Sequence, residues 1–256
     1  MCSVVILRRP DHSWPVVIAA NRDEMADRPA APPDRHWPDR PEIVAGLDRL
    51  SGGSWLGLND AGVVAAVLNR AGTLGPADGK RSRGELVLEA LEHADAVDAA
   101  SALAELESRA WRPFNLLVAD DRDAYWIAAP DADDPRPDRP VRVRPVPEGV
   151  SMLTAHDLND RSSPRIARYL PKFEAAVPPD PDTGDWAAWE ALLAETGAEP
   201  GAGPLGGLAV VTDTGYGTVS SSLIALPDTG LAERKPVWRF AAGRPGTAPF
   251  TPVTLG

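Results

Sequence analysis

The stretch MCSVVILRRPDHSWPVVIAANRDE, residues 1–24, decides the fold of this chain. Two short apolar runs, at 3–7 and 15–20, flank a turn at 11–13 and predict a β-hairpin. The polar tetrapeptide Asn21-Arg22-Asp23-Glu24 closes the second run. Pairing of the two strands across the turn brings the start of the chain close to this tetrapeptide.

Cys2 is the only cysteine of the chain and directly follows Met1. We expect that Met1 is removed, because the residue after it is small, and that Cys2 then carries both a thiol and a free α-amine. An amine with an ordinary pKa of about 7.7–8.0 can take the proton of a thiol with a pKa of about 8.5 as sulfur attacks a carbonyl. For Cys2 considered alone, the alternative is a small residue that begins a strand.

Arg22 and Asp23 are the neighbours that this chemistry needs. A carboxylate can hold and orient the α-ammonium group, and a guanidinium near the sulfur favours the thiolate. The alternative is a polar turn with a surface ion pair, which contributes about 0–1 kcal/mol.

The composition limits the classes of function. The chain of 256 residues is expected to form one domain over 1–256, and its net charge of −11 argues against general nucleic-acid binding. We find neither a signal peptide nor a membrane span, and one cysteine makes no internal disulfide, so a cytoplasmic protein is expected. The four histidines lack the spacing of metal ligands, so no metal site is expected.

The remaining elements alternate between groups of strands and groups of helices. Most neighbouring strands are joined by tight turns, so the chain is expected to form two mainly antiparallel sheets between helix layers. Ser163-Pro164 is typical of a helix start. Segments 26–41 and 130–148 are rich in proline and aspartate and are expected to be loops, and 208–212 is expected to form a late hairpin with 218–226.

Several short motifs occur together along the chain. They are Met1-Cys2, ANRDE at 20–24, GGSWLGLN at 52–59, Leu68-Asn69, RGELV at 83–87, FNLLVAD at 114–120 and YGTVSS at 216–221. This set resembles the NRDE family, whose eukaryotic members are called transport and Golgi organisation proteins. The family in turn is similar to N-terminal nucleophile (Ntn) hydrolases such as penicillin V acylases and bile salt hydrolases. The resemblance implies an α+β fold, a four-layer αββα sandwich.

The same resemblance implies roles for individual residues. Cys2 would be the nucleophile, with Arg22 and Asp23 beside it. Asn69, at the end of an apolar strand, would donate to the oxyanion. His156 stands where many relatives carry asparagine, and it is a second candidate donor.

A further four residues are expected to contact substrate: Asn21, Trp55, Arg70 and Asn159. The alternatives for Asn69 and Trp55 are a turn residue and a core residue. Many relatives carry arginine in the YGT-x-SS motif, where this chain has Val219. That departure puts catalysis in question unless Arg70 or Arg161 takes over.

Together these observations predict an N-terminal cysteine hydrolase or acyltransferase. Its substrate would be a small non-peptide amide or a thioester, cleaved through an acyl-Cys2 intermediate without a cofactor. The alternative is a non-catalytic protein on the same fold that binds and traffics haem, acyl-CoA or lipid. The sequence leaves the identity of the substrate and the oligomeric state open.

Overall fold

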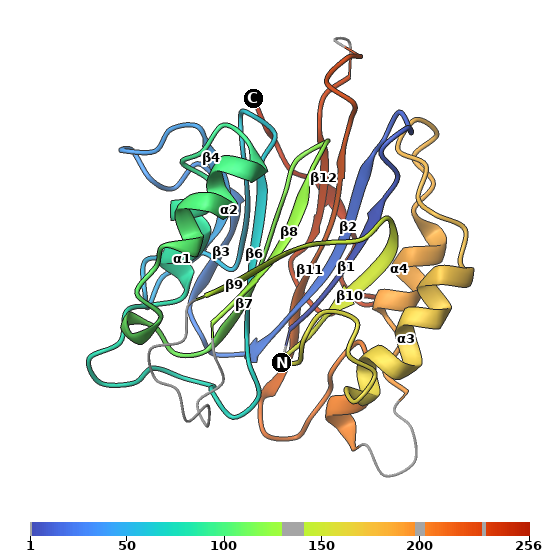
Figure 1. The fold of residues 1–256 in the computed structure, drawn as a ribbon. Coiled ribbons are helices and arrows are strands. Elements are labelled where there is room, and N and C mark those ends of the chain that lie inside the picture. Colours follow the sequence, from blue (N-terminus) through green and yellow to red (C-terminus); the bar gives the residue numbers. More distant parts are fainter. Residues whose placement is uncertain (1, 130–140, 198–202, 232–233) are drawn as a thin grey trace. The chain divides into compact units, whose positions relative to one another are not determined.

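The computed structural model describes residues 2–129, 141–197, 203–231 and 234–256 (Figure 1). They divide into two compact units, each with its own sheet and its own helices. The first unit combines the two ends of the chain, 1–28 with 147–254, and the second is formed by 29–146. The single domain expected over 1–256 stays a prediction.

The first unit contains an antiparallel sheet of six strands among the described residues. In spatial order these are β10 (Gly149–Leu153), β1 (Ser3–Arg8), β2 (Val16–Met25), β11 (Tyr216–Leu226), β12 (Val237–Ala241) and β13 (Thr251–Pro252). Its helices are α3 (Pro164–Ala175), α4 (Ala187–Leu193) and the 3₁₀ turn η2 (Pro204–Gly206).

The hairpin expected at the start of the chain is confirmed. β1 pairs antiparallel with β2, from Ser3 opposite Asn21 to Arg8 opposite Val16. The strand does not end at Ala20, because the polar tetrapeptide 21–24 continues it as far as Met25. β11 pairs along the other edge of β2 over nearly its whole length, so these polar residues lie inside the sheet and not in a turn.

One face of this sheet is covered by α3 and α4. Odd-numbered residues such as Val5 of β1 and Val17 of β2 point toward the helices, where they meet Tyr169, Phe173 and Trp189. The helix start expected at Ser163-Pro164 is confirmed, since the Ser163 hydroxyl accepts a hydrogen bond from the backbone N–H three residues on. The strand alternation therefore separates a face packed on helices from the opposite face.

The second unit contains an antiparallel sheet of seven strands among the described residues. In spatial order they are β3 (Ala30–Asp34), β4 (Ile43–Asp48), β5 (Leu56–Asn59), β6 (Val64–Asn69), β7 (Phe114–Ala119), β8 (Ala124–Ala128) and β9 (Arg142–Pro145). Its helices are α1 (Gly84–Ala90), α2 (Ala96–Ala104) and the 3₁₀ turn η1 (Ser108–Ala110).

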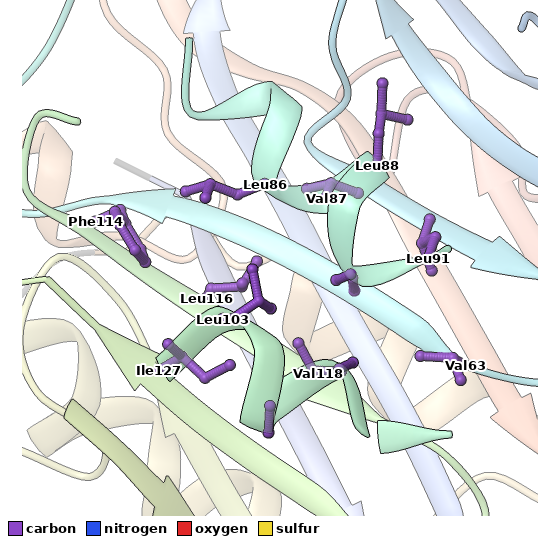
Figure 2. Packing of buried hydrophobic residues seen from close by; sticks show 14 of the residues in the cluster. Val63, Leu86, Val87, Leu88, Leu91, Leu103, Phe114, Leu116, Val118 and Ile127 are labelled. Carbon is purple, nitrogen blue, oxygen red and sulfur yellow. The ribbon is translucent and has the colours of Figure 1, made fainter. Parts of the chain in front are cut away.

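Figure 2 shows the core of the second unit, where α1 and α2 pack on the sheet. Leu86 and Leu91 from the α1 region and Leu103 from α2 meet the strand residues Leu116 and Ile127. All five side chains are buried. Burial of each such side chain contributes roughly 1.5–3 kcal/mol, so this apolar contact holds the helices on the sheet.

Three expectations about local structure are corrected. Segment 26–41 is not all loop, because Ala30–Asp34 pairs with β4 as an edge strand, where prolines are tolerated. The described part of 130–148 likewise includes the edge strand Arg142–Pro145, and 130–140 lies outside the described residues. The expected hairpin of 208–212 is reduced to a single bridge between Val211 and Gly217, because β11 pairs with β2 and β12 instead.

The fold is α+β with two antiparallel sheets, as the sequence predicts. Within the described ranges, none of the helices has the length and apolar character needed to cross a bilayer.

Candidate functional site around Cys2

Cys2 lies at the start of β1, beside the polar end of β2. The pairing of Ser3 with Asn21 places Cys2 next to Arg22 and Asp23 on the neighbouring strand. The Cys2 sulfur is 3.8 Å from the main-chain oxygen of Asp23, to which the thiol donates a weak hydrogen bond. Cys2 is half-buried, whereas Arg22 and Asp23 are buried. The proximity of Cys2 to the pair at 22 and 23, expected from the hairpin, is therefore observed.

The carboxylate of Asp23 is held by two side chains distant in sequence. Its Oδ1 accepts a hydrogen bond of 2.6 Å from the Thr218 hydroxyl on β11. Its Oδ2 accepts one of 3.0 Å from the Arg165 guanidinium, which comes from the first turn of α3. Neither carboxylate nor guanidinium is more than 4% exposed. A buried charge needs both a partner and hydrogen bonds, and Asp23 has them.

Arg165 also bonds to the residue that follows Cys2. The same Nη1 that contacts Asp23 donates to the Ser3 hydroxyl at 2.7 Å, and Nη2 donates to the main-chain oxygen of Leu205 at 2.8 Å. One guanidinium thus joins the first residue of β1, the end of β2 and the turn at 204–206. This planar group with several N–H donors in fixed directions suits such a bridge.

The surroundings of Cys2 disfavour its thiolate. Burial raises the pKa of the Cys2 thiol above its ordinary value, and the negative charge of Asp23 acts in the same direction. The chain's α-ammonium group and Arg22 oppose this shift in part. Burial also raises the pKa of the Tyr216 phenol well above its usual range, with the charges of Cys2 and Asp23 adding to it. Tyr216 therefore stays protonated and donates to the main-chain oxygen of Asp23 at 3.4 Å.

His156 and Asn159 belong to the loop that follows β10. Leu153, the last residue of β10, pairs with Val4, so His156 lies at the same end of the β1–β10 pair as Cys2. Asn159 turns back toward the strand with a φ of +59°. Its side-chain oxygen accepts a hydrogen bond of 2.8 Å from the Met152 N–H, and its side-chain nitrogen donates one of 3.1 Å to the Ser151 hydroxyl. Asn159 thus caps the edge strand, and its expected contact with substrate stays a prediction. The oxyanion role of His156 also stays a prediction.

The side chain of Asn21 binds within the first unit. Its side chain is buried, both amide N–H groups donate at 3.0 Å to the main-chain oxygens of Leu193 and Leu208, and its oxygen accepts from Ser221 at 2.6 Å. Two of these partners use both N–H donors of the amide, and the third uses its oxygen. Asn21 therefore ties β2 to the end of α4, and its expected contact with substrate stays a prediction.

Three further predicted residues belong to the second unit, and their contacts are described within it. Asn69 is half-buried at the end of β6, opposite Phe114. Arg70 is buried and donates a hydrogen bond of 2.7 Å to the Asn115 side chain. Trp55 is half-buried, and its ring occupies the space that a Cβ atom on Gly46 would need. Their roles toward Cys2 stay predictions.

Sequence reasoning missed Arg165, Thr218 and Tyr216. A signal for Arg165 exists, because it lies four and eight residues before Tyr169 and Phe173 on the apolar face of α3. A charged residue in such a series must be buried with a partner. Thr218 and Tyr216 belong to the YGTVSS motif, whose local pattern does not show that they contact Asp23. Val219 of the same motif lies at a register shift between Thr218 and Ser220.

No group of three or more histidine, cysteine, aspartate or glutamate side chains that could hold a metal ion occurs in the part of the chain that the structure describes. The site at Cys2 instead combines one thiol, one guanidinium–carboxylate pair and the hydroxyl groups of Ser3, Thr218 and Tyr216. Such an arrangement can hold a nucleophile and control its protonation.

Comparison with known proteins relates this arrangement to a family. A family model described as Transport and Golgi organisation 2 matches residues 1–232. The Transport and Golgi organization protein 2 homologs of Bos taurus and Homo sapiens are 36% and 38% identical to the chain over 116 residues. Each alignment covers 43% of this chain and 40% of the relative, so the matched part is less than half of either protein.

Solved structures share the fold at low sequence identity. A conjugated bile acid hydrolase variant from Clostridium perfringens has a TM-score of 0.59 at 11% identity, and the match covers 99% of this chain and 92% of that one. The Caenorhabditis elegans ortholog of N-acylethanolamine-hydrolyzing acid amidase has a TM-score of 0.55 at 15% identity, with 90% and 95% covered. The penicillin V acylase from Agrobacterium tumefaciens has a TM-score of 0.50 at 14% identity, with 94% and 83% covered. These are Ntn hydrolases, so the expected fold is confirmed.

Proposed function

The chain belongs to the Transport and Golgi organisation 2 family, and from this premise we propose that it is an N-terminal cysteine hydrolase or acyltransferase. Its substrate would be a small non-peptide amide or a thioester. The observation that carries the proposal is the position of Cys2 beside a buried Arg22 and an Asp23 held by Arg165 and Thr218.

Two further findings support this function. The fold is that of enzymes whose names state hydrolysis of N-acylethanolamines and of conjugated bile acids, and the acylase named for penicillin V shares it. The chain also has one cysteine, so no other thiol could serve as the nucleophile.

The proposed reaction begins once Met1 is removed and Cys2 carries the α-amine. The amine takes the thiol proton as sulfur attacks the acyl carbon, which forms the new C–S bond. The C–N or C–S bond of the substrate then breaks, and the α-ammonium returns the proton to the leaving group. Water, or an acceptor amine, attacks the acyl-Cys2 thioester and releases the product. Asn69 and His156 are the proposed side-chain donors to the oxyanion, each contributing roughly 2.7–4 kcal/mol if it is used.

The test is the intact mass of the purified protein before and after exposure to penicillin V, an N-acylethanolamine and a β-lactone acyl probe. We expect a species that begins at Cys2 and gains one acyl group on that residue. Cys2→Ala should abolish both adduct and turnover, and Cys2→Ser should keep the fold and lose most of the rate, because a serine hydroxyl is a much weaker nucleophile than a thiolate. Full turnover in Cys2→Ala would overturn the proposal.

A second function, binding and trafficking of haem or an acyl-lipid without catalysis, is favoured by the family description, which names transport. Val219, in place of the arginine of many relatives, points the same way. Titration with haem distinguishes the two functions. A Soret shift that is lost in Cys2→Ala, with no acyl adduct from any probe, would favour binding.

A further inference from the structure

We propose that Arg165 is a positioning residue for Cys2, because it holds the side chains of Ser3, which follows Cys2, and of Asp23, whose main-chain oxygen receives the thiol. This inference deepens the proposed function and rests on it for the chemistry of Cys2. The contacts that carry it are the bonds of Arg165 to Ser3 at 2.7 Å and to Asp23 at 3.0 Å.

The first step of the argument concerns geometry. Ser3 is the residue bonded to Cys2, and the Cys2 sulfur lies 3.8 Å from the main-chain oxygen of Asp23. A single nitrogen of Arg165 bridges the side chains of Ser3 and Asp23, and the second nitrogen is anchored on Leu205. The residue that follows Cys2 and the residue whose main-chain oxygen receives the thiol are thus both bound to one guanidinium.

The second step concerns energy. A buried ion pair is weak evidence for a stabilising role, because apolar residues of similar volume often replace such a pair at no cost in stability. The helix face on which Arg165 lies is otherwise apolar, with Tyr169 and Phe173 in the same series. A leucine or methionine would suit that face as well. The guanidinium of Arg165 is better explained by its contacts with Ser3 and Asp23, the residues next to Cys2.

The third step concerns charge. Asp23 raises the pKa of the Cys2 thiol, and Arg22 and the chain's α-ammonium lower it. Tyr216 and Glu24 complete the set of titratable groups on the neighbouring strands, and the phenol of Tyr216 is affected by both Asp23 and Arg165. The positive charge of Arg165, 3.0 Å from Asp23, offsets the negative charge that works against the thiolate.

The experiment uses the full-length protein, whose intact mass records whether it begins at Met1 or Cys2. The rate of alkylation by iodoacetamide is measured from about pH 6 to about pH 10, a range that includes the ordinary pKa of a thiol. Because the chain has one cysteine, the rate reports Cys2 alone. In Arg165→Gln we expect alkylation to be about tenfold slower near neutral pH, and the pH profile to move toward higher pH, because the charge of Asp23 is no longer offset.

Two variants test whether the effect passes through Asp23. In Asp23→Asn/Arg165→Gln, the negative charge is also gone, so the pH profile should return toward that of the wild-type protein. In Arg165→Lys, which keeps the charge, most of the shift should be rescued. Arg239→Gln is the matched control, because its guanidinium pairs with Glu190 at 2.6 Å in the same unit and its alkylation profile should be unchanged.

A folded Arg165→Gln with the wild-type pH profile would overturn the inference. Should this variant fail to fold, as judged by circular dichroism, the decision passes to Ser3→Ala and Asp23→Asn. Ser3→Ala removes one of the two contacts, so alkylation of Cys2 should slow, and Asp23→Asn should move the alkylation profile to lower pH. Unchanged behaviour in both would also overturn the inference. Alkylation needs no substrate, so its result stands even if no acyl-Cys2 forms and the proposed function fails.

Discussion

At the scale of single residues, Asp23 connects the parts of the site. Its main-chain oxygen receives the Cys2 thiol and the Tyr216 hydroxyl, while its carboxylate binds Thr218 and Arg165. The sequence predicted that Asp23 lies near Cys2, since strand register follows from the hairpin. It could not predict which side chains bind the carboxylate, because Arg165 and Thr218 approach from elements that are distant along the chain.

The raised pKa of Cys2 leads to a prediction about stability. A thiol whose pKa is raised in the folded state contributes stability that is fully present below the ordinary thiol pKa, about 8.5, and is lost as pH rises through the folded value. We therefore expect the free energy of unfolding of the wild-type protein to fall relative to Cys2→Ser as pH increases above about 8.5. Urea denaturation of both proteins from about pH 7 to about pH 10 measures this difference in unfolding free energy on both sides of the ordinary thiol pKa.

The serine variant is also the control, because it keeps Tyr216, whose own titration at high pH then affects both proteins alike. A difference in unfolding free energy that is constant with pH would contradict the prediction.

At the scale of elements, strands with alternating or continuous apolar residues were predictable, and the edge strands β3 and β9 were not. β3 and β9 are rich in proline and charge, so their sequences are typical of loops, and only pairing with β4 and β8 makes them strands. The reverse holds for 208–212, where an apolar run forms one bridge because β11 already has partners on both sides. Which strands pair with each other depends on the whole sheet, so the local sequence of one segment does not predict it.

Two of the glycine motifs meet in the second unit, and this contact predicts the effect of a substitution. A Cβ atom on Gly53, from GGSWLGLN, would lie 2.5 Å from the main-chain carbon of Gly84, from RGELV. The Ser54 N–H also donates to the Gly84 oxygen at 3.0 Å, so the loop cannot move away freely. We expect Gly53→Ala to destabilise the protein by roughly 1–3 kcal/mol, as measured by urea denaturation.

Ser51→Ala, an exposed position two residues earlier in the same loop, should change stability by no more than about 0.5 kcal/mol. If Gly53→Ala unfolds at the wild-type urea concentration, the close approach of the two backbones does not matter for stability.

At the scale of the whole molecule, the α+β class with two antiparallel sheets followed from the order of strands and helices and from the quoted motifs. The function did not follow as directly, because three predicted site residues, Trp55, Asn69 and Arg70, lie in a different unit from Cys2. Their roles toward Cys2 therefore stay predictions.

The net charge of −11 predicts a response to salt. Self-repulsion of the acidic chain destabilises the compact state, whereas each exposed ion pair, such as Arg35 with Asp60, contributes only about 0–1 kcal/mol. Screening should therefore remove more repulsion than attraction. We expect the thermal midpoint to rise as KCl increases from about 0.01 M to about 0.1 M, over which the Debye length falls from about 30 Å to about 10 Å. A midpoint that falls with KCl would mean that ion pairs outweigh the net charge.

The register shift in β11 has a consequence for evolution. Val219 stands between Thr218, opposite Asp23, and Ser220, opposite Arg22, so it is a surplus residue that the neighbouring strand leaves without a counterpart. Such a residue is free to vary in type while its presence is compulsory, since losing it would rotate the preceding threonine away from the carboxylate. A substitution at this point therefore keeps the ladder, whereas a deletion would change the register of β11 beside Asp23.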